Sequence, residues 1–103
     1  MIPIIIQTTC ANKKEAKKIA KVLIEKKLAA CIQISDVESI YMWKNEICND
    51  KEKLLNIKTK KENFEKIKRK IKELHSYDLP EIIAIEITNI SDEYKKFIGE
   101  NTK

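Results

Sequence analysis

Residues 28–59 constrain the possible folds of this chain more than any other stretch. Apolar residues, many of them β-branched or aromatic, dominate 28–43 and again 54–59, and such residues favour strands. Residues 44–46 (KNE) form a polar break between the two runs, and Asn45 tolerates the left-handed backbone that a tight turn often needs. We therefore predict one long antiparallel hairpin that reverses at this break.

The tip of this predicted hairpin carries more large apolar side chains than a small monomer could bury. Trp43 is the only tryptophan of the chain, and Tyr41 is one of three tyrosines. We expect another subunit to cover the tip, through a subunit interface that contains Tyr41, Met42, Trp43 and Ile47. Stacking of the two rings on nucleic-acid bases is the alternative, but residues 54–59 lack the Gly-and-aromatic signature of RNA-recognition domains.

The composition predicts one folded, soluble domain over residues 1–103, because the 43% hydrophobic content is ordinary and the charge is high. The net charge of +5 suggests a nucleic-acid partner. However, Arg69 is the only arginine, and the lysines alternate with glutamates as on a solvated helix face, so we expect no nucleic-acid binding. No apolar run approaches the ~20 residues of a membrane span, so we expect no membrane contact. Three cysteines without C-x-x-C spacing favour free thiols in a reducing cytoplasm.

The remaining hydrophobic pattern predicts two strand–helix–strand units and a last short helix. Strands are expected at 2–8 and 81–88, a helix before the hairpin and another after it, and the last helix from Ser91. This order predicts an α+β fold, the ferredoxin-like βαββαβ sandwich with a four-stranded antiparallel sheet and both main helices on one face. The other face would be bare and apolar, which predicts association with further copies.

Three local features of this pattern carry sharper predictions. Asn12 with Glu15, and Thr59 with Glu62, are spaced as capping boxes at the two helix starts. The polar run 35–38 interrupts the apolar alternation of the hairpin, so we expect a bend or bulge there.

Five segments of the chain form a further pattern: 28–31 (LAAC), 39–43 (SIYMW), 54–59 (LLNIKT), 75–82 (HSYDLPEI) and 93–102 (EYKKFIGENT). Taken in order, they resemble the CutA family of divalent-cation tolerance proteins. The resemblance runs the whole chain with almost no gaps. It implies a tight homotrimer whose long hairpins extend the neighbours' sheets, with a shape like that of the PII signalling proteins. It also implies a cytoplasmic protein linked to tolerance of copper and other divalent cations, with no established reaction and no organic cofactor.

The resemblance implies metal contacts at His75 and Glu81, which match the family pattern. Some relatives place a cysteine where this chain has Thr8, and Cys10 stands two residues beyond. Relatives also carry proline where this chain has Ser76. Imidazole, carboxylate and thiol are plausible ligands for copper(II) or another divalent cation, so we predict a metal site of His75, Glu81 and Cys10 at an inter-subunit cleft. The alternative is that His75 only caps a helix end, where the helix dipole favours it.

Two further alternatives concern the thiols and the overall role. Cys10 precedes a predicted helix, where a thiolate is favoured, so we expect it to react faster than Cys31 or Cys48. A Cys10–His75 nucleophile and base is conceivable, but nothing in the sequence brings the two together, and we predict no enzyme. The alternative to a metal role is a PII-like trimeric signalling or scaffold module that binds a small effector or a partner protein.

Overall fold

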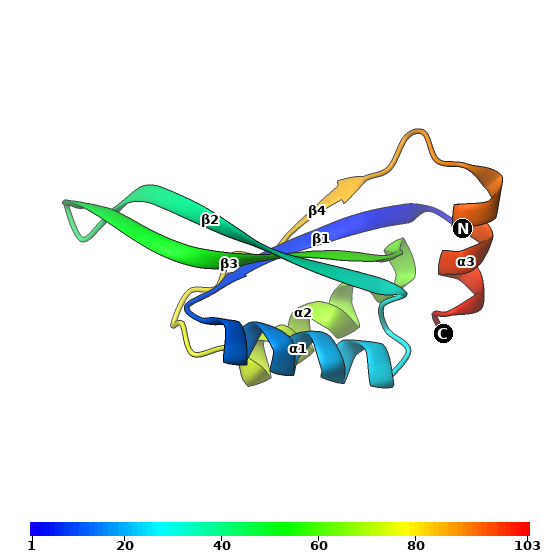
Figure 1. Ribbon diagram of the computed structural model, residues 1–103, viewed down its shortest axis with the longest axis horizontal. Helices are drawn as coiled ribbons and strands as arrows, with labels where there is room; N and C mark the ends of the chain where they lie inside the picture. The colour runs from blue at the N-terminus through cyan, green and yellow to red at the C-terminus, as the bar shows by residue number, and fades with distance from the viewer.

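A four-stranded antiparallel sheet organises the computed structural model, which describes all of residues 1–103 (Figure 1). The strands are β1 (Pro3–Cys10), β2 (Cys31–Trp43), β3 (Glu46–Lys60) and β4 (Ile83–Glu86). Their order across the sheet is β2-β3-β1-β4, so the first strand lies in the interior and the fourth at an edge. β4 is shorter than the predicted 81–88, because it pairs with only four residues of β1.

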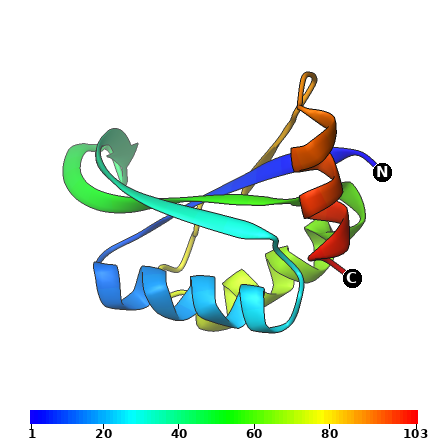
Figure 2. The same cartoon turned by 45° about the vertical axis from the view of Figure 1, so that its right-hand side comes forward.

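Two helices cover one face of the sheet, and a third lies at its end. α1 (Lys13–Glu25) and α2 (Phe64–Leu74) run beneath the strands, while α3 (Asp92–Glu100) stands beside the N-terminus (Figures 1 and 2). The side chains between sheet and helices are almost completely buried: Ile4, Ile6, Ile19, Leu23, Leu55, Ile57, Ile67 and Ile71. The predicted α+β class with a four-stranded antiparallel sheet is confirmed. No helix is long and apolar enough to cross a membrane.

The predicted hairpin is confirmed, and its outer half projects beyond the helices (Figure 1). The chain turns at Lys44 and Asn45, whose φ angles of 50° and 66° are left-handed, as two-residue hairpin turns require. We call residues 38–51 the arm, and no residue of the arm is buried.

The bulge expected at residues 35–38 is wrong. β2 and β3 pair in one unbroken register from Cys31 opposite Lys58 to Trp43 opposite Glu46. Polar residues do not interrupt the ladder there because the strands have passed the ends of the helices, and Ser35, Asp36 and Glu38 are exposed to water. The polar run therefore marks the end of the covered part of the sheet and not a break in a strand.

One capping prediction is half confirmed and the other is wrong. Asn12 caps α1, since its Oδ1 accepts the Glu15 backbone N–H at 2.8 Å, but the Glu15 carboxylate does not return the bond to Asn12. Thr59 is buried and donates to the carbonyl of Leu28 at 2.6 Å instead of capping a helix. A short 3₁₀ turn, Lys61–Asn63, precedes α2.

Candidate functional site

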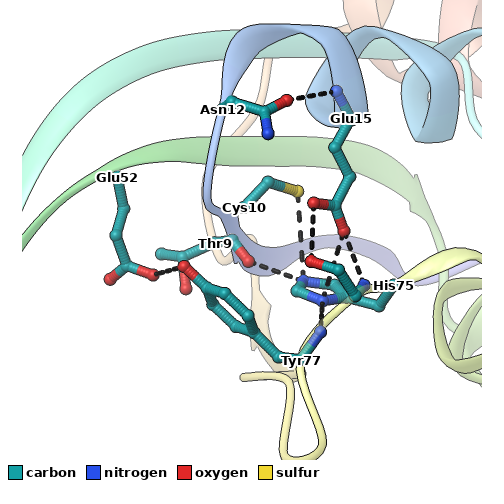
Figure 3. A network of polar contacts seen from close by, with 8 residues as sticks. Thr9, Cys10, Asn12, Glu15, Glu52, His75 and Tyr77 are labelled. Atoms are coloured by element: carbon teal, nitrogen blue, oxygen red, sulfur yellow. Dashed lines mark hydrogen bonds and ion pairs between the residues drawn. The ribbon is translucent and has the colours of Figure 1, made fainter.

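Three potential metal ligands meet at one end of the helix-covered face. Cys10 ends β1, Glu15 lies in the first turn of α1, and His75 follows the last residue of α2 (Figure 3). One ligand atom from each lies within 4.8 Å of the others. The fold thus joins residues that are far apart in sequence, and we call Cys10, Glu15 and His75 the buried cluster.

Both ring nitrogens of His75 have partners, although its side chain is completely buried. Nε2 lies 2.7 Å from the carbonyl oxygen of Thr9, which can only accept, so this nitrogen carries the proton. Nδ1 accepts the backbone N–H of Tyr77 at 3.1 Å. The hydrogen bonds therefore fix the neutral tautomer with its proton on Nε2.

The Glu15 carboxylate ties the start of α1 to the residues that follow α2. It accepts the backbone N–H of Ser76 at 2.7 Å and the Ser76 hydroxyl at 2.8 Å. One of its oxygens also lies 3.5 Å from Nδ1 of His75. Because that nitrogen carries no proton and already accepts the Tyr77 N–H, this contact is neither a hydrogen bond nor an ion pair.

Cys10 is fully buried, and its thiol is not a thiolate. Burial, with the nearby carboxylates of Glu15 and Glu52, raises its pKa from the ordinary 9.0 to about 12. The prediction that Cys10 is the most reactive thiol is wrong, because Cys31 and Cys48 are both more exposed. The prediction failed because β1 ends with the Cys10 side chain inside the core, away from water.

Tyr77 lies between the buried cluster and Glu52 (Figure 3), and both Tyr77 and Glu52 line an open groove. Its backbone N–H donates to His75, and its hydroxyl donates to Glu52 Oε2 at 2.7 Å. Burial and this carboxylate raise the pKa of Tyr77. The groove has a volume of about 570 Å³ and lies between the arm and the segment that follows α2. Its lining includes four carboxylates and three aromatic rings: Asp50, Glu52, Asp78, Glu81, Tyr41, Trp43 and Tyr77.

The structure brings together two of the three residues proposed from the sequence as metal ligands. Cys10 and His75 are adjacent, with Sγ 4.0 Å from Nε2, whereas Glu81 is exposed and lines the groove. Glu15, and not Glu81, supplies the carboxylate of the buried cluster. The sequence analysis assigned Glu15 to a helix cap, and no local pattern distinguishes a carboxylate that returns to its own cap from one that reaches across the fold.

The residues expected at a subunit interface are all exposed in the single chain. The exposed fractions are 42% for Tyr41, 64% for Met42, 43% for Trp43 and 76% for Ile47. Sequence reasoning missed Glu52 and Tyr77, which join the arm to the buried cluster. Glu52 lies within a polar run, and nothing in that run indicates that it alone becomes buried.

This arrangement of sheet, helices and projecting hairpin defines a known class of small α+β proteins. The family described as CutA1 divalent ion tolerance protein matches residues 4–101 of the chain. The chain therefore belongs to the CutA family, and the resemblance seen in the sequence is confirmed.

Relatives from distant organisms are similar over nearly the whole chain. The divalent-cation tolerance protein CutA of Thermus thermophilus is 40% identical, over 95% of this chain and 96% of its own. The corresponding protein of Pyrococcus horikoshii is 37% identical, over 97% of this chain and 98% of its own. The structure of a CutA described as periplasmic, from Archaeoglobus fulgidus, superposes with a TM-score of 0.96 at 36% identity, covering 98% and 99% of the two chains.

Proposed function

We propose that this chain is a divalent-cation tolerance protein that binds copper(II) or another divalent metal ion through the buried cluster. The observation that carries the proposal is the convergence of a thiol, a carboxylate and an imidazole within 4.8 Å. This donor set suits copper and zinc, and family membership gives the role its context. Glu81 remains in the proposal as a ligand that a neighbouring subunit would bring to the cleft.

A metal ion bound at this cluster would replace hydrogen bonds that the cluster residues already make. A metal ion on His75 would replace either the Nε2 bond to Thr9 or the Tyr77 N–H bond to Nδ1. A metal ion on Cys10 would displace the thiol proton, so binding would release protons and weaken as pH falls. His75, Cys10 and Glu15 would hold the ion, and the ion would supply Lewis acidity.

Calorimetric titration with copper(II) tests the proposal. His75→Ala is expected to lose measurable affinity, and Cys10→Ala to weaken binding, because each removes a donor atom. Cys48→Ala is the matched control, since it removes a thiol outside the cluster. Equal affinity in His75→Ala and the parent chain would remove the histidine from the site.

We also propose that the chain is a ferredoxin-like subunit of a cytoplasmic homotrimer. The strand order β2-β3-β1-β4 supports the ferredoxin-like arrangement. Two apolar surfaces without intrachain partners support the trimer. One is the arm, and the other includes Ile83 and Ile85 of β4, which are 46% and 49% exposed. Light scattering should give three times the 12.0 kDa chain mass, and a stable 12.0 kDa particle would overturn the trimer.

The second candidate function is a PII-like signalling or scaffold module, and the groove of about 570 Å³ favours it. That volume suits a small molecule. Enzymatic activity is not part of either proposal. Although Cys10 Sγ and His75 Nε2 are 4.0 Å apart, Nε2 donates its proton to Thr9 and has no lone pair to accept a proton from the thiol.

A further inference from the structure

No helix lies across the sheet face opposite α1 and α2, and α3 stands only at its end (Figures 1 and 2). We call it the bare face, and its side chains include Ile5, Gln7, Leu54, Asn56, Ile83 and Ile85. Gln7 points there because its neighbours Ile6 and Thr8 are buried on the helix side, and successive side chains of a strand alternate. Asn56 lies opposite Gln7 on β3 and accepts its Nε2 at 2.8 Å through Oδ1. The bare face is therefore polar at its centre, although the sequence pattern predicted an apolar face.

This amide pair leaves one acceptor and one donor unused. A side-chain amide has a carbonyl acceptor and an NH₂ group with two donors. The bond between the two residues uses a donor of Gln7 and the oxygen of Asn56, and neither side chain makes another hydrogen bond. Gln7 Oε1 and the Nδ2 of Asn56 are therefore free, on two side chains that are already half-buried. Any protein that covers this face must supply a matching donor and acceptor, because a buried polar group without a partner is costly.

Apolar side chains without intrachain partners surround the amide pair. Ile83 of β4 lies opposite Gln7, and Ile85 lies opposite Ile5 one step further along the same face. Both isoleucines of β4 are exposed in the single chain. An apolar surface with a few hydrogen-bonding groups at its centre is typical of a protein–protein contact.

The order of charges along this face favours a second copy of the chain as the partner. On β3, Lys58 and Lys60 lie on one side of the amide pair, and Glu52 and Asp50 lie on the other, all pointing to the same face. None of these four takes part in an ion pair within the chain. A complementary partner carries acidic groups opposite the lysines and basic groups opposite the carboxylates. A copy packed head to tail presents that order, and it also brings its own free amide donor and acceptor.

We propose that Gln7 and Asn56 form the polar contact between copies of this chain, with the free acceptor of one pair bonded to the free donor of the next. The inference rests on the trimer proposed above and names the residues that set how its sheets meet. With one acceptor and one donor in each chain, three copies close a ring in which no amide group is left unpaired. Apolar packing alone tolerates several arrangements, whereas a satisfied polar pair in apolar surroundings selects one.

Asn56→Asp tests the proposal, with light scattering over a range of protein concentrations as the measurement. The aspartate still accepts the Gln7 Nε2, so the bond within the chain is kept, but the donor to the neighbouring copy is replaced by a negative charge. At neutral pH the concentration at which the oligomer dissociates should rise by roughly tenfold or more, because a covered charge lacks a counter-charge. At acidic pH the protonated aspartate regains a donor, and the mass of the parent oligomer should return. Asn89→Asp, in the exposed loop between β4 and α3, is the matched control and should keep the parent mass at both pH values.

A double change, Gln7→Leu with Asn56→Leu, tests whether the pair selects one arrangement. The two leucines remove every amide group and keep the face covered with apolar side chains. The double variant should still associate, but with more than one oligomer mass, because no polar contact distinguishes one packing from another. A single mass equal to that of the parent would overturn the proposal. This variant also decides the question by itself if Asn56→Asp does not fold.

The mass of the parent chain separates this inference from the proposed trimer. A parent that stays at 12.0 kDa would overturn both. A parent of three times that mass, with Asn56→Asp dissociating at the same concentration as Asn89→Asp, would overturn the amide contact and leave the trimer standing.

Discussion

The arm and the helix-covered part of the sheet share two strands but differ in what their side chains contact. Ile57 and Ile47 both lie on β3, yet Ile57 is completely buried under the helices and Ile47 is 76% exposed. Backbone pairing is continuous through both parts, so the ladder alone does not require a core. The difference teaches that the covered part contains the core of the chain, whereas the arm is held by strand pairing and presents apolar surface outward.

The largest expected effect comes from truncating a core isoleucine. Ile57→Ala should lower the free energy of unfolding by about 2–5 kcal/mol at any protein concentration, because it leaves a cavity beneath α1 and α2. Chemical denaturation measures the loss. Ile47→Ala is the matched change on the same strand. It should leave stability unchanged in dilute solution, where the chains are apart, and lower the melting temperature only where they associate. Equal losses from both variants in dilute solution would break the comparison.

An intermediate effect is expected at alkaline pH from the buried thiol of the covered part. The raised pKa of Cys10 means that the folded chain holds the thiol proton more tightly than the unfolded chain does. This contribution to stability is complete below pH 9.0 and is lost as pH rises toward about 12. The stability advantage of the parent chain over Cys10→Ala should therefore shrink over that range.

Cys48→Ala provides the control for this pH dependence, because Cys48 lies in the arm and is only half-buried. It removes a thiol outside the buried cluster, so an alkaline effect specific to Cys10 is the difference between the two variants. Unfolding curves in denaturant at several pH values compare the three proteins. A gap between the parent and Cys10→Ala that widens with rising pH would contradict the burial of the thiol.

The smallest expected effect concerns two lysines with left-handed backbone, one in each part. Lys27, between α1 and β2, has a φ of 56°, and Lys44, at the tip of the arm, has a φ of 50°. Glycine adopts this backbone without a Cβ penalty, so each Lys→Gly change should gain about 0.5 kcal/mol locally. Lys27→Gly should raise the global stability, while Lys44→Gly should slow hydrogen exchange only in the arm. A gain in global stability from Lys44→Gly would show that the arm unfolds together with the covered part.

The sequence predicted those parts of the fold that depend on local pattern. The alternation of apolar residues placed the hairpin, and the KNE break placed its turn, because strand propensity and turn chemistry act over a few residues. Asn12 was recognised as a cap for the same reason. The bulge at 35–38 was predicted wrongly because polarity was taken as a break in the strand, when it only reflects the exposure of Ser35, Asp36 and Glu38 to water.

The candidate site depends on contacts between distant segments, which local pattern does not contain. Glu15 reaches Ser76 across 61 positions, and Tyr77 reaches Glu52 across 25. The burial of the Cys10 side chain also depends on the path of the chain from the end of β1 to the start of α1. The family resemblance therefore identified His75 and Cys10 as candidates, while their actual partners required the folded chain.

The two hydrogen bonds of Tyr77 have a thermodynamic consequence. One end of the residue donates to His75 and the other to Glu52, and the rings of Tyr77 and His75 lie 4.8 Å apart. A ligand that drew Glu52 away from the hydroxyl would loosen the anchoring of Tyr77 and so affect its bond to the imidazole, and an ion on the imidazole would affect the bond at the carboxylate. By linkage, the factor by which the first event changes the second equals the factor by which the second changes the first. Tyr77 would thereby couple the groove to the buried cluster through a single residue.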